Sequence, residues 1–95
     1  MNFKKIGFIG LGLIGGSIAK KIKINHPDYE IIATARRLET ITEAYEMNLI
    51  SNNELLSLEE FADCDLIFLC APVEKNLDYL RNLKEIISDH TIITD

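Results

Sequence analysis

The 95-residue sequence has no tryptophan and only two cysteines, two prolines and two histidines. So few cysteines exclude a disulfide-built fold, and Cys64 and Cys70 are expected to be buried thiols in a reducing compartment, which favours the cytoplasm. They could not form a zinc site without further ligands. No paired carboxylates and no Ser/His/Asp arrangement can be assembled either. We therefore expect neither a metal site nor a catalytic residue in this chain.

Positive charge is also scarce, because ten lysines and arginines stand against fifteen acids and give a net charge of −5. Nucleic-acid binding needs a basic face, so nucleic acid is not expected as a partner. Lys20, Lys21 and Lys23 are interpreted as a solvated helix face. No apolar run reaches the ~18 residues of a membrane span, and the glycine-rich start lacks a cleavage site. Neither a membrane segment nor a targeting segment is predicted.

The chain is short for a cofactor-dependent enzyme. Domains commonly have about 100–150 residues, so residues 1–95 are expected to form one domain or part of one. Hydrophobic residues make up 47% and charged residues 26%, which is an ordinary globular composition. If the protein is catalytic, we expect this chain to be one domain of a larger enzyme.

Short apolar runs alternate with amphipathic stretches. The runs at residues 5–9, 30–35, 65–70 and 91–94 predict buried strands, and a weaker run at 55–57 predicts an edge strand. Strands that alternate with helices imply right-handed crossovers and a parallel sheet covered on both faces. The sequence therefore predicts an α/β fold, a Rossmann-type doubly wound sheet in the strand order 3-2-1-4-5, with the first strand central and residues 55–57 at the edge.

Three apolar stripes at helical spacing predict the amphipathic helices between these strands. The stripes are Ile14, Ile18 and Ile22; then Leu38, Ile41, Tyr45 and Leu49; and last Leu77, Leu80, Leu83 and Ile87. The first helix is expected to end near residues 25–27. Ser57 and Glu60 have the spacing of a capping box, which predicts a further short helix.

A G-x-G-x-x-G motif lies between the first strand and the first helix, formed by Gly10, Gly12 and Gly15. The motif alone is weak, but a strand before it and a helix after it are the context of a dinucleotide-binding loop. Gly10 permits the tight turn, Gly12 lets a pyrophosphate approach the backbone, and Gly15 lets the helix pack closely on the sheet. The start of the helix favours the phosphate charge.

The end of the second strand bears on the choice of cofactor. NAD-binding domains usually carry an acid about 20 residues after the glycines to bind the ribose, but Ala35 stands there and Arg36 and Arg37 follow. The nearest acids, Glu30 and Glu39, lie at the other end of the strand and in the next helix. Guanidinium groups bind phosphate through a fork of donors. The sequence therefore favours NADP over NAD, with solvated arginines as the alternative.

Three segments resemble prephenate and arogenate dehydrogenases, the oxidoreductases of tyrosine biosynthesis. These are residues 6–19 with the glycine motif, residues 62–73 with an acidic entry, an apolar strand and a Pro-Val pair, and residues 91–95. The resemblance implies an amino-terminal dinucleotide-binding domain that ends before a helical substrate and dimerisation domain. The cofactor contacts that it implies are Gly10, Leu13, Ile14 and Gly15 at the pyrophosphate, Arg36 and Arg37 at the ribose, and Ala71, Pro72 and Val73 in the facing loop.

By the same resemblance, the whole enzyme would be a cytoplasmic homodimer that oxidatively decarboxylates prephenate or arogenate with NADP or NAD. The family's catalytic histidine lies beyond Asp95, so no catalytic residue is assigned and this chain alone is expected to be inactive. Two other readings stay open. One is a nucleotide-sensing module without a reaction, and the other is a dehydrogenase of a hydroxyacid or imino acid.

Overall fold

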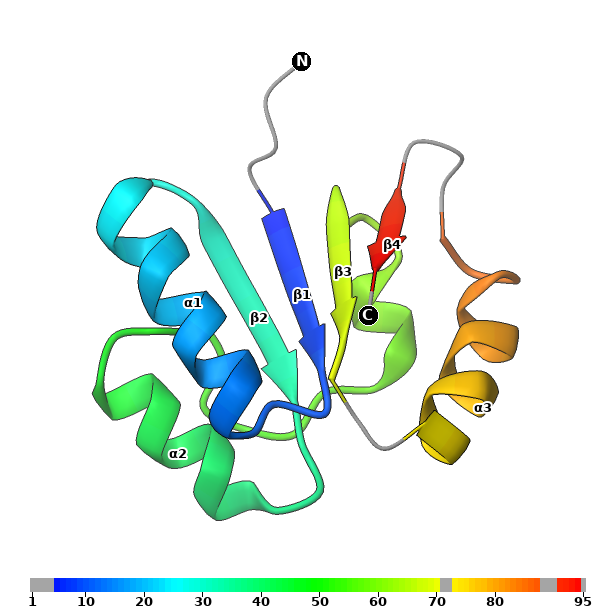
Figure 1. Ribbon diagram of the computed structural model, residues 1–95, viewed down its shortest axis with the longest axis horizontal. Helices are drawn as coiled ribbons and strands as arrows, with labels where there is room; N and C mark the ends of the chain where they lie inside the picture. The colour runs from blue at the N-terminus through cyan, green and yellow to red at the C-terminus, as the bar shows by residue number, and fades with distance from the viewer. Residues whose placement is uncertain (1–4, 71–72, 88–90, 95) are drawn as a thin grey trace.

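The computed structural model describes residues 5–70, 73–87 and 91–94 (Figure 1). Its strands are β1 (Lys5–Ile9), β2 (Glu30–Thr34), β3 (Leu66–Leu69) and β4 (Ile92–Thr94). Its helices are α1 (Leu13–Asn25), α2 (Leu38–Glu46), α3 (Val73–Leu83) and the single-turn 3-10 helix η1 (Leu58–Phe61). All strand pairs are parallel, and the order is β2-β1-β3-β4. The predicted Rossmann-type parallel sheet with a central first strand is confirmed.

Strand β1 lies between its two predicted neighbours. Ile6 stands opposite Ile31 of β2 on one side and opposite Leu66 of β3 on the other. Because side chains alternate across a strand, Ile6 and Phe8 point to one face of the sheet and Ile9 points to the opposite face. The central strand therefore contributes to both layers of the core, which explains its nearly continuous apolar sequence.

The two faces of the sheet are covered by different helices. Phe8 packs in one cluster with Ala19 of α1 and Ile41 of α2, while Ile9 packs in the other with Phe61 of η1 and Leu83 of α3. The helices that follow β1 and β2 therefore cover one face of the sheet, and the helices before and after β3 cover the other. In the sheet, this change of face falls between the neighbouring central strands β1 and β3 (Figure 1). In doubly wound sheets the crevice at the carboxyl ends of such strands is the usual ligand site.

The predicted edge strand at residues 55–57 is wrong, because this segment has no strand structure. A side chain occupies its place beside β2. The Asn52 amide accepts a hydrogen bond from Ala33 N–H at 3.0 Å and donates one to Ala33 C=O at 2.8 Å. Ser51 N–H donates to Ile31 C=O at 2.7 Å. The edge of β2 is thus satisfied without a further strand, and Leu55 remains 48% exposed.

Replacing Asn52 by alanine is expected to destabilise the chain by about 1–3 kcal/mol, because both backbone groups of the buried Ala33 lose their partner. Chemical denaturation would measure the loss of stability, and the hydrogen-exchange rate of the Ala33 amide should rise. Asn53→Ala is the matched control, since Asn53 is exposed and its change should cost less than about 0.5 kcal/mol. Equal stabilities of the two variants would show that the Asn52 amide does not hold this edge.

The predicted helices are present, but their buried faces differ from the predicted stripes. In α2, Ile41 and Ala44 are buried, whereas Leu38 and Tyr45 are 47% and 43% exposed. At about 100° per residue, Leu38 and Tyr45 lie roughly 60° and 40° round the helix from Ile41, on the side away from Ala44. The small Ala44 side chain therefore turns this flank of α2 outward, and the expectation of a core position for Tyr45 is wrong.

Two further expectations about the helices need correction. Helix α3 ends at Leu83, so Ile87 packs on the core from the segment after the helix, and Leu77 is 60% exposed. Ser57 does precede a short helix, but its side chain makes no capping hydrogen bond, because η1 is a single 3-10 turn. None of the helices in the described part of the chain is long and apolar enough to cross a membrane.

Candidate nucleotide-binding loop

The turn between β1 and α1 is fastened to the end of β2. Gly10 has a φ of 82°, the left-handed region in which glycine is favoured, and this confirms the predicted reason for a glycine there. The N–H groups of Gly10 and Leu11 both donate to Thr34 C=O, at 2.9 Å each. The glycine turn and the start of the β2–α2 connection therefore lie side by side.

Gly12 is the N-cap of α1 and is open on its outer side. Its backbone is extended, with φ −145° and ψ −151°. A Cβ atom built on Gly12 would meet nothing nearer than Gly10 O, at 4.0 Å. The helical ladder begins with Gly16 N–H donating to Gly12 C=O at 2.8 Å. The N–H groups of Leu13, Ile14 and Gly15 precede that bond, so this first turn presents backbone donors.

Gly15 is buried against the end of β3. A Cβ atom at this position would lie 3.2 Å from Leu11 Cδ1 and 3.4 Å from Cys70 Sγ. The predicted reason for this glycine, close packing of the helix on the sheet, is confirmed. Nothing in the sequence pattern indicates that Cys70 is the residue beneath it. Cys70 is only half-buried, contrary to expectation, and burial raises the pKa of its thiol.

Arg36 and Arg37 are exposed between β2 and α2. Arg37 is the N-cap of α2, and β2 ends one residue before Ala35. Glu39 is the acid in the first turn of α2. Two guanidinium groups therefore stand at the start of a helix, beside the connection whose Thr34 carbonyl holds the glycine turn. An anion is favoured at such a place by both the arginines and the helix dipole.

A cleft of about 430 Å³ runs between α1 and α2 from the glycine turn. Its lining residues are Leu11 and Gly12 of the glycine turn, Gly16, Ser17 and Lys20 of α1, Thr40, Glu43 and Ala44 of α2, and Met47 directly after α2. No local sequence pattern predicts this cleft, because it is formed by two helices whose lining residues are at least 20 positions apart. Lys20, interpreted as part of a solvated face, lines it.

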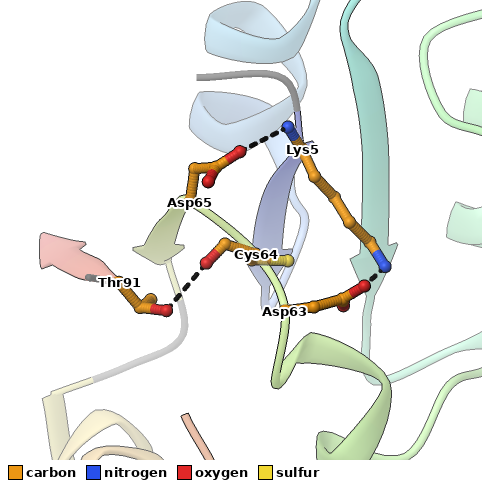
Figure 2. A network of polar contacts seen from close by, with 5 residues as sticks. All are labelled: Lys5, Asp63, Cys64, Asp65 and Thr91. Atoms are coloured by element: carbon orange, nitrogen blue, oxygen red, sulfur yellow. Dashed lines mark hydrogen bonds and ion pairs between the residues drawn. The ribbon is translucent and has the colours of Figure 1, made fainter. Parts of the chain in front are cut away.

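The acidic entry to β3 lies at the opposite end of the strands (Figure 2). Asp65 accepts a hydrogen bond from Lys5 N–H at 3.0 Å, and Thr91 Oγ1 donates to Cys64 C=O at 2.7 Å. The Lys5 ammonium pairs with Asp63 at 2.7 Å. These bonds tie β1, β3 and the chain before β4 together, so the acidic entry has a structural role.

The pKa shifts of the ionisable groups in this network follow from their contacts. Burial of Lys5 opposes its charged form, but the hydrogen bond and the charge of Asp63 outweigh it and raise the pKa of the lysine. The hydrogen bond from Lys5 lowers the pKa of Asp63. Burial raises the pKa of the Cys64 thiol to about 12, so that thiol is protonated and a poor nucleophile.

The loop expected to face the cofactor comprises Ala71, Pro72 and Val73. Ala71 and Pro72 lie outside the described residues, and Val73 is the first residue of α3. Within α3, the Asn76 side-chain amide donates to Leu69 C=O at 3.4 Å, at the carboxyl end of β3. The glycine turn, the two arginines and the start of α3 therefore lie after the carboxyl ends of β1, β2 and β3 in turn, at one edge of the sheet (Figure 1).

The family described as "NADP oxidoreductase coenzyme F420-dependent" matches residues 5–94. A curated prephenate dehydrogenase of Lactococcus lactis subsp. cremoris (strain MG1363) is 34% identical over 93 residues, which are 97% of this chain and 26% of that protein. A second curated prephenate dehydrogenase, from Bacillus subtilis (strain 168), is 34% identical over 87 residues, 90% of this chain and 24% of that protein.

Two solved structures share the fold. The arogenate dehydrogenase of Synechocystis is 32% identical with a TM-score of 0.81, and the match covers 96% of this chain and 32% of that one. The prephenate dehydrogenase of A. aeolicus, solved with hydroxyphenyl propionate and NAD+, is 25% identical with a TM-score of 0.86, covering 100% and 34%. The chain thus spans about a quarter of these curated relatives and a third of these structures. The resemblance found in the sequence is confirmed.

Proposed function

This chain belongs to the family described as NADP oxidoreductase, coenzyme F420-dependent, and from that premise we propose that its glycine turn binds a nicotinamide dinucleotide. The observation that carries the proposal is the open flank of Gly12, where a Cβ atom would meet nothing nearer than Gly10 O, at 4.0 Å. No described neighbour requires glycine there, whereas a pyrophosphate does, because it must approach the backbone. The A. aeolicus relative was solved with NAD+.

The chain offers a complete set of groups for the pyrophosphate. Gly10 makes the turn, Gly12 leaves the approach open, and the N–H groups of Leu13, Ile14 and Gly15 precede the first bond of the helical ladder. Such amides, together with the helix dipole, favour a phosphate charge. The loop with Ala71, Pro72 and Val73 is proposed to face the cofactor across the point where the chain changes sides of the sheet.

The whole protein is proposed to be a prephenate or arogenate dehydrogenase, with residues 1–95 as its dinucleotide domain. Its relatives are three to four times longer than this chain, and the substrate-binding and dimerisation parts are proposed to lie in the remainder. The dinucleotide, when bound, would accept a hydride from the substrate ring. The role of this chain is to bind and orient the cofactor. Residues 1–95 alone should therefore bind dinucleotide without turnover.

NADP is the proposed cofactor, in preference to NAD. The end of β2 carries Thr34 and Ala35 in place of a carboxylate, and Arg36 and Arg37 are exposed at the start of α2. A carboxylate would repel a ribose 2′-phosphate, while guanidinium groups bind it through paired donors. The connection that carries both arginines begins beside the glycine turn, since Thr34 C=O accepts from Gly10 and Leu11.

The chain should bind NADP+ more tightly than NAD+ at low salt, by about ten-fold or more, since a charge-assisted contact contributes about 1.5–3 kcal/mol. Arg36→Ala should remove most of that difference, and rising salt should reduce it because the contact is exposed. Calorimetric titration of both dinucleotides into both proteins measures the ratio. Arg81→Ala is the control, as an exposed arginine in the last turn of α3. A ratio near one in the unaltered chain would contradict the assignment.

A further inference from the structure

The cleft between α1 and α2 is not needed by the pyrophosphate, yet it opens directly beside the pyrophosphate loop. Gly12 and Leu11 belong to both. On the other side of its mouth is the first turn of α2, which carries Thr40 and follows Arg37. A cofactor that lies across Gly12 toward the arginines would therefore pass the mouth of this cleft. Its volume of about 430 Å³ is large enough for a sugar and a phosphate.

Gly16 lines the same cleft without a packing reason to be glycine. A Cβ atom at Gly16 would meet no atom within 4 Å, in contrast to the tight contacts that explain Gly15. Glycine inside a helix is less stable than alanine, because it has more backbone entropy to lose on folding. The described protein contacts offer no compensation for this loss. Space for a ligand at the second turn of α1 does account for it.

Lys20 is the cation of the cleft and is available to a ligand. Four residues after Gly16, it lies about 6 Å further along the same side of α1, and helical side chains lean back toward the N-terminus. Among the residues that the structure describes, the Lys20 side-chain ammonium forms no ion pair or hydrogen bond, although Glu43 lines the opposite wall. A phosphate in the cleft would have Lys20 on the α1 side and Glu43 on the α2 side, and Arg37 precedes the lining residue Thr40 at the start of α2.

We propose that the cleft between α1 and α2 receives the 2′-phosphorylated ribose of NADP+, with Gly16 giving it access and Lys20 pairing with its phosphate. This inference rests on the proposed function and extends it. It assigns NADP+ selectivity to both sides of the ribose, the arginines at the start of α2 and a lysine on α1. Glu43 reduces the preference for NADP+ over NAD+, because its side chain lines the same cleft and its negative charge repels the phosphate.

The first test changes the charges of the cleft. Lys20→Gln should weaken binding of NADP+ and of adenosine 2′,5′-bisphosphate about five- to ten-fold, and should change binding of NAD+ and 5′-AMP less than two-fold. Lys21→Gln is the matched control, an exposed neighbour that does not line the cleft. Glu43→Gln should act in the opposite direction and strengthen NADP+ binding. Inorganic phosphate alone, titrated into the same proteins, separates general anion binding from recognition of the nucleotide.

The second test changes the shape of the cleft. Gly16→Leu should weaken NADP+ binding about ten-fold or more while the melting temperature stays equal or rises, because leucine is a better helix former than glycine. A purely structural role for Gly16 would not weaken binding in a protein of unchanged or higher stability. Gly16→Ala should show the same opposed changes with a smaller loss of affinity.

The outcomes separate this inference from the proposed function. A selective loss of NADP+ affinity in Lys20→Gln, together with weaker NADP+ binding by a fully stable Gly16→Leu, supports the cleft as the ribose phosphate site. If Lys20→Gln lowers NADP+ and NAD+ affinity equally, or if neither variant changes NADP+ affinity while Arg36→Ala does, the cleft assignment is overturned and the dinucleotide proposal stands. If the unaltered chain binds neither dinucleotide at millimolar concentration, the proposed function itself fails.

Discussion

Replacing Gly12 by valine is expected to lower the affinity of the chain for both NADP+ and NAD+ by about 100-fold or more, which corresponds to roughly 2.7 kcal/mol. The valine side chain would fill the free space on the outer side of Gly12, where the pyrophosphate must approach the backbone. The backbone there is extended, a conformation that valine adopts without strain. The cost to the fold should therefore be confined to a poorer N-cap, at most about 1 kcal/mol.

Titration calorimetry measures the affinities, and thermal unfolding shows that the variant is folded. Gly12→Ala serves as the graded control, since a single methyl group should reduce affinity less than valine at similar stability. The effect differs in kind from that of Arg36→Ala, which should act on NADP+ alone. If Gly12→Val is folded and binds dinucleotide as tightly as the unaltered chain, the glycine turn is not the binding site.

The central part of the fold could be predicted because local sequence determines it. Residues 5–9, 30–35 and 65–70 are short apolar runs bounded by turn residues, which are typical of strands covered on both faces. The alternation with helices then determines the parallel order around β1. The glycine motif could be predicted for a similar reason, since the turn at Gly10 needs a positive φ.

The edge of the sheet could not be predicted, because a side chain competes there with a strand. Residues 55–57 have the composition of a weak strand, but Asn52 already pairs with both backbone groups of Ala33. Nothing in the local pattern indicates that an amide 19 positions from its partner will take this role. The face of α2 was misplaced for a comparable reason, since the contact of Ala44 with the core decides which flank of the helix turns outward.

Contacts between distant segments account for the unpredicted part of the site. The cleft exists because α1 and α2 pack on the same face of the sheet, and its lining joins Gly16 and Lys20 to Thr40 and Glu43. The glycines also show that a local motif does not predict contacts between distant segments. The motif explained Gly10, Gly12 and Gly15, but it left Gly7 as one more residue of an apolar strand, and only the structure shows what lies against it.

Gly7 is the glycine with the largest expected effect on stability. It lies in the middle of the central strand, and a Cβ atom there would be 2.5 Å from Phe61 Cδ2 and 3.0 Å from Cys64 Sγ. Phe61 and Cys64 are both fully buried, so neither side chain has free space to move into. The absence of a side chain at Gly7 therefore allows η1 to place its phenyl ring directly on the sheet.

Gly7→Ala should destabilise the chain by about 2–3 kcal/mol through overpacking, and lower its melting temperature by roughly 10–20 °C at the 4–8 °C per kcal/mol typical of this size. Gly16→Ala is the control for stability, since it adds the same methyl group where no atom lies within 4 Å, and it should raise the melting temperature slightly. The double variant Gly7→Ala/Phe61→Leu should lose less than the sum of the single changes, because the smaller side chain leaves room for the methyl group. A melting temperature of Gly7→Ala at or above that of the unaltered chain would show that the ring moves aside easily, and that η1 does not depend on the missing side chain.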